Sequence, residues 1–331
     1  MAVMVGRAAA PVAPRRRGKQ RRVRVRRRSS ALDRLAYLGL RAVTGGLAML
    51  PLGVAMRVTE AVALVAYVCD RPHRRIGMRN LAIAFPERAL HERRRILRAS
   101  FLNLGRMVAE LAHLPHLTDD DLRRMVIFEN EAWWAENIAA PRETGGLVLS
   151  GHFGNWELLV FAHGMRGYPV SMVHRAIANP LVDRWLNALR ARAGTRLVRK
   201  RHAAGGVLKA LHDRELLVLP FDQNSTRGLG VFVDFFGLPA STNSGMARLS
   251  LRSGAPAVPV FIVREGRSAR HRVHVLPLMY AERSGDLEKD VRINTQRYSD
   301  VFESMVRRYP EQWFWVHKRW KTRPAGEPKL Y

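Results

Sequence analysis

A histidine and a glutamate five residues apart are the side chains in this sequence best placed for acid–base chemistry. They are His152 and Glu157, in the stretch "LSGHFGNWELL". Inside one helix, five residues correspond to a rotation of about 500°, so the two side chains would point about 140° apart. The pair can therefore meet only if His152 lies in a turn before a helix whose first turn carries Glu157.

The residues around the pair favour such a turn. Gly151 and Gly154 permit a sharp strand-to-helix connection, and Asn155 is a suitable helix N-cap. Glu157 would then accept a hydrogen bond from one imidazole nitrogen of His152 and leave the other as a general base. A purely structural turn has the same residue pattern, and the spacing alone supports both interpretations equally.

Other catalytic chemistries lack their sequence patterns. Ser150 does not stand in the G-x-S-x-G context of a nucleophile elbow. The H-E-x-x-H pattern is absent and Cys69 is the single cysteine, so neither a metal site nor an intrachain disulfide is predicted.

Strands and helices alternate from residue 145 onward. The apolar run "GGLVLS" precedes the histidine turn, and the buried strand predicted for "ELLVLPFD" ends at Asp222. This order predicts an α/β fold with a largely parallel sheet, whose strand ends carry the chemistry. Residues 70–140 are predicted to be helical, because their apolar positions recur with a period close to 3.6.

The chain is strongly basic. Lys and Arg number 56 against 28 Asp and Glu, for a net charge of +28. Such an excess indicates an anionic partner: nucleic acid, anionic lipid or an acidic carrier protein. Residues 1–30 contain no acid and are predicted to be a disordered arm, which is either a solvated tail or an electrostatic tether to anionic headgroups. Nucleic acid is the less favoured partner, because no aromatic residue is interleaved in the arm.

Residues 31–70 are mostly apolar. Their longest uncharged window, 42–56, is shorter than the roughly 20 residues that span a bilayer, and Pro51 interrupts it. The segment is therefore predicted to be a helical hairpin that anchors the protein in one membrane leaflet. The alternative is a buried helical pair in a soluble core. No cleavage site typical of a signal peptide is present.

Three features together resemble one enzyme family. They are the His-x-x-x-x-Glu spacing, "DQN" ahead of "VDFFG", and the Trp/His/Arg-rich "WFWVHKRW" ahead of "KTRP". This combination is similar to the late acyltransferases of lipid A biosynthesis, of the lauroyl/myristoyl type, in the lysophospholipid acyltransferase superfamily. The resemblance extends from "RNLAIAFPE" at 79–87 to Tyr331.

The resemblance implies a fold and a reaction. The fold is a glycerolipid-acyltransferase-like α/β domain over 71–331, with a mixed, largely parallel sheet flanked by helices. The reaction moves a fatty acyl group from an acyl carrier protein thioester to a hydroxyl of an anionic lipid A precursor. The resemblance also implies that the protein is located at the inner membrane, with its site facing the cytoplasm. No cofactor, metal, covalent acyl-enzyme or nucleic acid partner is implied.

The resemblance also assigns roles to residues. His152 would take the hydroxyl proton and Glu157 would hold His152. Arg175 and Arg190 match family arginines and would bind an acceptor phosphate or the developing negative charge. Backbone amides around Gly154 are further candidates for stabilising that charge.

Further residues are assigned to the acceptor. Asp222 and Gln223 match the family's "DQ" and would position the acceptor or support Arg190, whereas Asn224 stands where related members often carry aspartate. Within 313–320, the tryptophans fit a buried core. Lys318 and Arg319, with Lys321, would contact phosphates or the membrane interface.

Three alternatives stay open. A related enzyme would acylate another membrane acceptor, such as a lysophospholipid, an ornithine lipid or a phosphatidylinositol mannoside. A degenerate member would bind lipid without catalysis. A hydrolase would use the same residue types, because exclusion of water, which separates transfer from hydrolysis, is not visible in a sequence.

Overall fold

The computed structural model describes residues 30–331 except 130, 138–143, 200–202 and 227. The basic arm predicted for residues 1–30 thus lies, apart from Ser30, outside the described residues. Four helices come first: α1 (Ser30–Ala48), α2 (Leu52–Cys69), α3 (Arg71–Ala84) and α4 (Leu90–His113). Local signals set their ends. Pro51 separates α1 from α2, and the Asp70 carboxylate caps α3 by accepting from the backbone N–H of His73.

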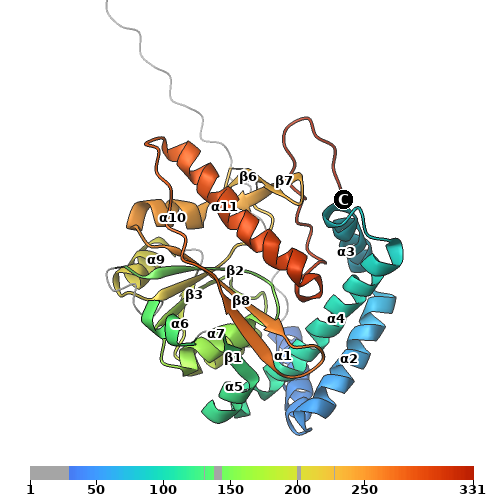
Figure 1. Cartoon of the computed structure of the whole chain (residues 1–331). Coiled ribbons are helices and arrows are strands. Elements are labelled where there is room, and N and C mark those ends of the chain that lie inside the picture. The colour runs from blue at the N-terminus through green and yellow to red at the C-terminus, as the bar shows by residue number, and fades with distance from the viewer. Residues whose placement is uncertain (1–29, 130, 138–143, 200–202, 227) are drawn as a thin grey trace, which may run out of the picture.

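A seven-stranded sheet forms the centre of the fold, in the order β1-β9-β8-β2-β5-β3-β4 (Figure 1). Its strands are β1 (Val126–Phe128), β2 (Gly146–Ser150), β3 (Val170–His174), β4 (Arg196–Arg199), β5 (Leu216–Pro220), β8 (Ala257–Arg264) and β9 (His271–Val275). The β8–β9 pair is antiparallel and the other pairings of this sheet are parallel. The predicted mixed, largely parallel sheet is confirmed.

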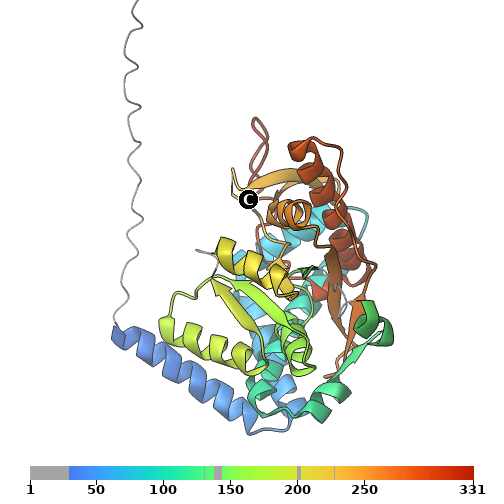
Figure 2. The same ribbon diagram turned by 90° about the vertical axis from the view of Figure 1, so that its left-hand side faces the viewer.

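Helices cover both faces of the sheet, as the two views show (Figures 1 and 2). The remaining helices are α5 (Asp119–Met125), α6 (Glu131–Asn137), α7 (Trp156–Met165), α8 (Pro180–Arg192), α9 (Ala203–His212), α10 (Gly245–Ser253) and α11 (Leu287–Arg308), with short 3₁₀ turns at Leu114–His116 and Pro310–Gln312. Leu147 and Leu149 pack with α9, α10 and α11, while Val148 packs with α5 to α8. This alternation along β2 explains why a fully apolar strand is buried on both faces.

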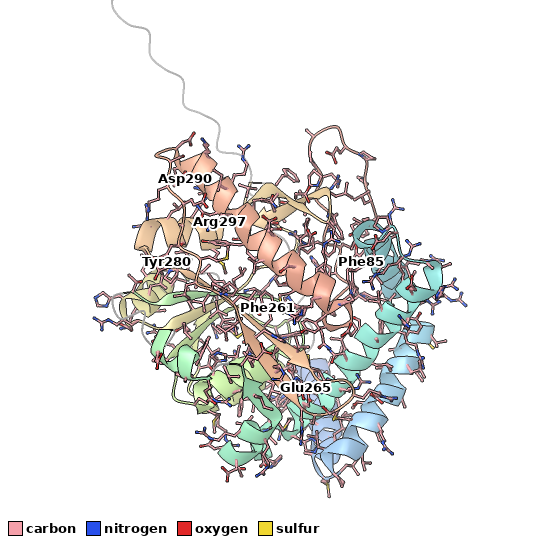
Figure 3. All side chains as sticks on the ribbon, in the orientation of Figure 1. Phe85, Phe261, Glu265, Tyr280, Asp290 and Arg297 are labelled. Atoms are coloured by element: carbon pink, nitrogen blue, oxygen red, sulfur yellow. The ribbon has the colours of Figure 1, made fainter. Side chains whose placement is uncertain are left out.

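One core side chain links the sheet to the closing helix. Phe261 of β8 lies near the middle of the molecule, and Glu265 lies at the turn after β8 (Figure 3). The Phe261 ring is fully buried against Phe153 and Phe302, each with ring centroids 5.5 Å away. Aromatic packing thus holds the segment after β2, which carries His152, against α11.

Three strands were not predicted. Strand β1 lies within the 70–140 segment predicted to be helical. A separate antiparallel hairpin, β6 (Gly230–Phe235) and β7 (Leu238–Asn243), packs on α11. Its turn residues Phe236 and Gly237 have φ of 55° and 74°, as a two-residue type I′ turn requires. Phenylalanine is unusual at such a position, so "FG" gave no clear turn signal.

The segment 31–70 forms two helices, α1 and α2, as predicted, but the predicted hairpin packing is wrong, because α1 lies against α4 and α8 rather than along α2. Of the described helices, α2 alone is long and apolar enough to cross a membrane by length and composition, with 17% of its residues buried. It lies along α4: a Cβ on Gly105 would be 2.6 Å from the Thr59 carbonyl oxygen, so glycine permits the approach. The rings of Tyr67 and Phe101 meet at 5.4 Å near the end of α2. The start of α2 is also held, because an imidazole nitrogen of His113 lies 3.0 Å from the Leu50 carbonyl oxygen.

Candidate active site

His152 and Asp222 meet at the carboxyl edge of the sheet. Strands β2 and β5 are parallel neighbours with Ser150 opposite Pro220, so each side chain follows its strand by the same two residues. Nδ1 of His152 lies 3.0 Å from Oδ1 of Asp222. A Cβ on Gly151 would be 2.6 Å from the Asp222 carboxylate, so this contact requires glycine there.

Both oxygens of the Asp222 carboxylate are engaged. Oδ1 faces His152, and Oδ2 accepts a hydrogen bond of 3.0 Å from the Trp313 indole N–H. Burial would raise the pKa of Asp222, but the charge of His152 and these hydrogen bonds lower that pKa to about 2. Asp222 is therefore a carboxylate at neutral pH, with its charge directed at the imidazole.

The same contact controls the histidine. Burial would lower the pKa of His152, but the charge and hydrogen bond of Asp222, together with the charge of Glu157, raise that pKa above its ordinary value. The other nitrogen, Nε2, stays available for a proton, and the side chain is 25% exposed. Trp156 and Phe314 flank the ring at centroid distances of 5.1 and 6.2 Å. The arrangement is that of a general base oriented by a buried carboxylate.

The turn carrying His152 is fixed from both sides. Gly154 has φ +58°, and its N–H donates to the Gln312 carbonyl oxygen at 2.8 Å. The His152 carbonyl oxygen accepts from the backbone N–H of Phe314 at 3.1 Å. Asn155 caps α7 by accepting from the Leu158 N–H, as predicted. The glycine-rich turn between strand and helix is thus confirmed.

Glu157 lies on the first turn of α7 but pairs with an arginine. Its two oxygens accept hydrogen bonds of 2.9 and 2.5 Å from Arg190 of α8. The two side chains are 10% and 12% exposed, respectively. A bidentate pair so shielded from water fixes both groups strongly. Glu157 therefore contributes charge near His152 while its hydrogen bonds go to Arg190.

The family model described as bacterial lipid A biosynthesis acyltransferase matches residues 22–322. The chain belongs to this family. Membership supports an acyltransferase that acts in lipid A biosynthesis.

Individual family members from Escherichia coli K12 align over most of the chain. The lipid A biosynthesis lauroyltransferase is 29% identical over 90% of this chain and 94% of its own length. The palmitoleoyltransferase is 27% identical over 77% and 81%. The myristoyltransferase is 26% identical over 89% and 90%. The three relatives transfer different acyl groups by name, so this similarity does not assign an acyl chain to the present family member.

Three of the predicted roles change. The predicted hydrogen bond from His152 to Glu157 is wrong, because Asp222 occupies that position. Asp222 does not support Arg190 either, since Glu157 does. The backbone amide of Gly154 is not free to stabilise an oxyanion, because it donates to Gln312.

The cationic residues predicted to bind the acceptor differ in their exposure to solvent. Arg175 follows β3 at the same sheet edge and is exposed, as is Lys318. Arg319 is 1% exposed and donates to the Ser241 carbonyl oxygen and the Thr242 hydroxyl. Burial lowers its pKa to about 10. The prediction that Arg319 contacts phosphate or the interface is wrong, because its guanidinium cross-links the β6–β7 hairpin to the C-terminal segment.

The remaining predicted site residue, Gln223, is exposed beside His152. Its amide nitrogen lies 3.4 Å from each ring nitrogen of His152. The next residue, Asn224, is structural: its backbone N–H donates to Nε2 of His317 at 2.9 Å. Among the described residues, no group of three or more His, Cys, Asp or Glu is arranged to hold a metal ion.

A buried ion network behind the turn was not predicted. Glu110 of α4 is fully buried, accepts from Arg264 at 2.5 and 2.6 Å, and lies 2.8 Å from Nε2 of His271. It also accepts from the Asn155 side-chain amide at 2.7 Å. The available signal was a glutamate among the apolar positions of a helix, next to Ala109 and Leu111. This network anchors the N-cap of the helix that follows His152.

Replacement of Gly154 by alanine is expected to destabilise the fold by about 3 kcal/mol or more and to abolish activity. A Cβ there would lie 1.8 Å from the Ile262 carbonyl oxygen, so the turn must move. Gly167→Ala is the matched control: its φ is +77°, but a Cβ meets nothing within 4 Å. The free energy of unfolding of the control should fall by only about 1–2 kcal/mol, which is the cost of placing alanine in a left-handed backbone conformation. Urea unfolding in detergent measures both, and equal losses would contradict the steric argument.

Proposed function

We propose that this chain transfers a fatty acyl group from an acyl carrier protein thioester to a hydroxyl of a lipid A precursor. The observation that carries the proposal is the His152–Asp222 contact at the carboxyl edge of the sheet, in a member of the lipid A acyltransferase family. Asp222 engages Nδ1, so Nε2 is the nitrogen that meets substrate.

The reaction follows from that geometry. Nε2 of His152 takes the proton of the acceptor hydroxyl as its oxygen attacks the thioester carbonyl carbon. Asp222 stabilises the imidazolium that forms. The tetrahedral intermediate collapses, the carbon–sulfur bond breaks, and the imidazolium returns its proton to the thiolate. The products are an ester and a free thiol, and no covalent acyl-enzyme or cofactor takes part.

The developing oxyanion needs a donor other than the turn amide. Gly154 is engaged by Gln312, and Arg190 is engaged by Glu157. The Gln223 amide lies beside the imidazole and is exposed, which makes it the better placed donor. Arg175, exposed at the same edge, is proposed to bind a phosphate of the acceptor, with Lys318 as a second cation.

Membrane association is proposed to occur through α1 and α2. Their exposed apolar side chains include Leu35 and Leu38 of α1 and Val62 and Val65 of α2, each at least 60% exposed. Because both ends of α2 contact the folded body, the helix is proposed to lie in one leaflet rather than to cross it. The location is the inner membrane with the site on the cytoplasmic side, where the net charge of +28 suits acidic acyl carrier protein and the anionic glycolipid.

An acyl-transfer assay by mass spectrometry tests the proposal. Wild type and His152→Ala receive a mixed-chain acyl carrier protein pool with a tetra-acylated lipid A precursor, or with lysophospholipids. A His152-dependent mass gain on the precursor is expected. A mass gain only on a lysophospholipid would show that the acceptor is a phospholipid and not a lipid A precursor. Release of free fatty acid without acceptor gain would show a hydrolase, and no gain anywhere would leave a lipid-binding protein.

The pH dependence of kcat/KM is expected to show an acid limb with its midpoint above about 6.5, the ordinary imidazole pKa. The base must be neutral, and Asp222 raises the pKa of His152, so activity falls as pH drops through that raised value. In Asp222→Asn the raising charge is gone while burial remains, so the midpoint should move to lower pH. A midpoint unchanged in the variant would contradict this assignment.

A further inference from the structure

A cavity rich in arginine opens where α2, α3 and α4 meet. These three helices lie on the right-hand side of Figure 1. The volume of the cavity is about 480 Å³. The lining residues are Tyr67 from the end of α2, Arg74, Arg75 and Met78 from α3, and Leu90 and Arg94 from α4. No acidic side chain lines it, so three guanidinium groups share one concave site beside a tyrosine and two apolar side chains.

One of the three arginines is fixed by the protein. Nη1 of Arg74 donates to the carbonyl oxygens of Tyr67 and Val68 at 2.8 and 2.7 Å. Its guanidinium lies 5.6 Å from the centroid of the Tyr67 ring. These contacts cap the C-terminus of α2 and hold positive charge at the cavity wall.

The other two arginines are exposed and have no acidic partner among the described residues. The acids nearest in sequence are used elsewhere: Asp70 contacts His73, and the Glu92 carboxylate accepts from the Ala89 N–H. Arg75 and Arg94 therefore present uncompensated charge to the cavity. Arginine forks match phosphate oxygens in geometry and charge.

The cavity lies at the C-terminal end of α2, where it is lined by Tyr67, and the opposite side of this helix is an exposed apolar face. That face includes Val58, Val62, Val65 and Val68, which are 44, 64, 61 and 57% exposed. A helix lying in a leaflet with this face among the acyl chains would set its polar end at the level of the phosphates.

We propose that this cavity binds the phosphate headgroup of an anionic membrane phospholipid. Arg75 and Arg94 contact the phosphate, Arg74 adds fixed positive charge, and Met78 and Leu90 contact the glycerol and the first methylenes. The proposal rests on the proposed membrane association of α1 and α2. It does not depend on the acyl-transfer reaction, because the lining residues are separate from His152 and Asp222.

Vesicle co-sedimentation of the full chain tests it. The vesicles are phosphatidylcholine alone, or phosphatidylcholine with a minor fraction of phosphatidylglycerol. The variant is Arg75→Gln/Arg94→Gln. The control, Arg252→Gln/Arg292→Gln, removes the same charge from exposed arginines of α10 and of the first turns of α11. Helix α10 and Asp290, which is close to Arg292 in sequence, lie on the left of the molecule in Figures 1 and 3, away from α3. The cavity variant should lose about tenfold in binding to phosphatidylglycerol vesicles. The control should lose less than about twofold, and binding to phosphatidylcholine should stay unchanged for both.

Other outcomes would overturn the proposal in distinguishable ways. Equal losses in both double variants would show unspecific charge attraction. Displacement from vesicles by soluble glycerol phosphate at constant ionic strength would make the cavity a site for a free phosphate compound. A raised KM for acyl carrier protein with unchanged vesicle binding would assign the arginines to an acidic protein. Failure of wild type to bind any vesicle would remove the membrane premise, while the acyl-transfer assay in detergent would still report on the reaction.

Discussion

Asp222→Asn is expected to lower kcat for acyl transfer by roughly 10³- to 10⁴-fold while the fold is retained. The reason is that Trp313, Asp222 and His152 form one chain of hydrogen-bonded side chains. The Trp313 indole N–H donates to one oxygen of the Asp222 carboxylate, and the other oxygen faces Nδ1 of His152. In asparagine, the amide oxygen must face the indole N–H, so the NH₂ group faces Nδ1. That arrangement places the imidazole proton on Nε2 and removes the free base.

A double variant separates this tautomer effect from loss of charge. Trp313→Phe leaves the introduced asparagine amide free to turn its oxygen toward Nδ1, so Asp222→Asn/Trp313→Phe should recover part of the lost kcat relative to Asp222→Asn. Trp313→Phe alone supplies the reference. Steady-state kinetics with a purified acyl carrier protein thioester measure kcat, and circular dichroism checks the fold. A kcat for Asp222→Asn within tenfold of wild type would contradict the role given to Asp222.

The local part of this site could be predicted from the sequence, because its signals are local. Glycines at 151 and 154 and an N-cap residue at 155 define a turn within a few residues. The strand ending before Asp222 was also visible as an apolar run. Each of these features depends only on neighbours along the chain, and each is present in the structure.

The partner of His152 could not be predicted in the same way, because it depends on strand order. Strand β3 follows β2 in the chain, yet β5 lies next to β2 in the sheet. Only that order brings Asp222 to His152. The His-x-x-x-x-Glu spacing and the family resemblance predict Glu157 as the partner of His152, whereas Glu157 binds Arg190, which comes from another helix. Residue types indicate which groups can act, but the topology decides which groups meet.

Composition was misleading for one residue of the C-terminal segment. In "WFWVHKRW" the tryptophans Trp313, Trp315 and Trp320 are buried, as the core interpretation predicts, but Arg319 is buried with them. An arginine is buried at acceptable cost only where carbonyl or hydroxyl oxygens face it. Those oxygens belong to Ser241 and Thr242, in a hairpin whose position the sequence did not reveal.

Glu110→Gln is expected to lower the free energy of unfolding by about 3–5 kcal/mol, the effect of breaking a buried ion pair on one side. The Glu110 carboxylate is fully buried and accepts from Arg264, His271 and Asn155. Burial would raise its pKa, but His271 and Arg264 lower that pKa to about 2, so the group is charged. Glutamine keeps the volume, but it is neutral and its NH₂ group must face another donor.

The control for Glu110→Gln is Glu288→Gln. Glu288 also pairs with an arginine, Arg248, at 2.9 Å, but the two side chains are 66% and 43% exposed. Loss of the Glu288 carboxylate should change the free energy of unfolding by no more than about 0.5–1 kcal/mol. Urea unfolding of both variants in the same detergent compares a buried and an exposed pair of equal chemistry.

The rate of acyl transfer also tests the role of the buried Glu110 network. Glu110 holds the Asn155 side chain, and Asn155 caps the helix after His152, so folded Glu110→Gln should also show a lower kcat at temperatures well below its unfolding midpoint. Asn155→Ser keeps a capping oxygen but cannot reach Glu110 in the same way, and it should show the activity loss with a smaller loss of stability. Stability of Glu110→Gln within about 1 kcal/mol of wild type would mean that water or a shifted side chain replaces the carboxylate. The anchoring of the catalytic turn to α4 would then be wrong.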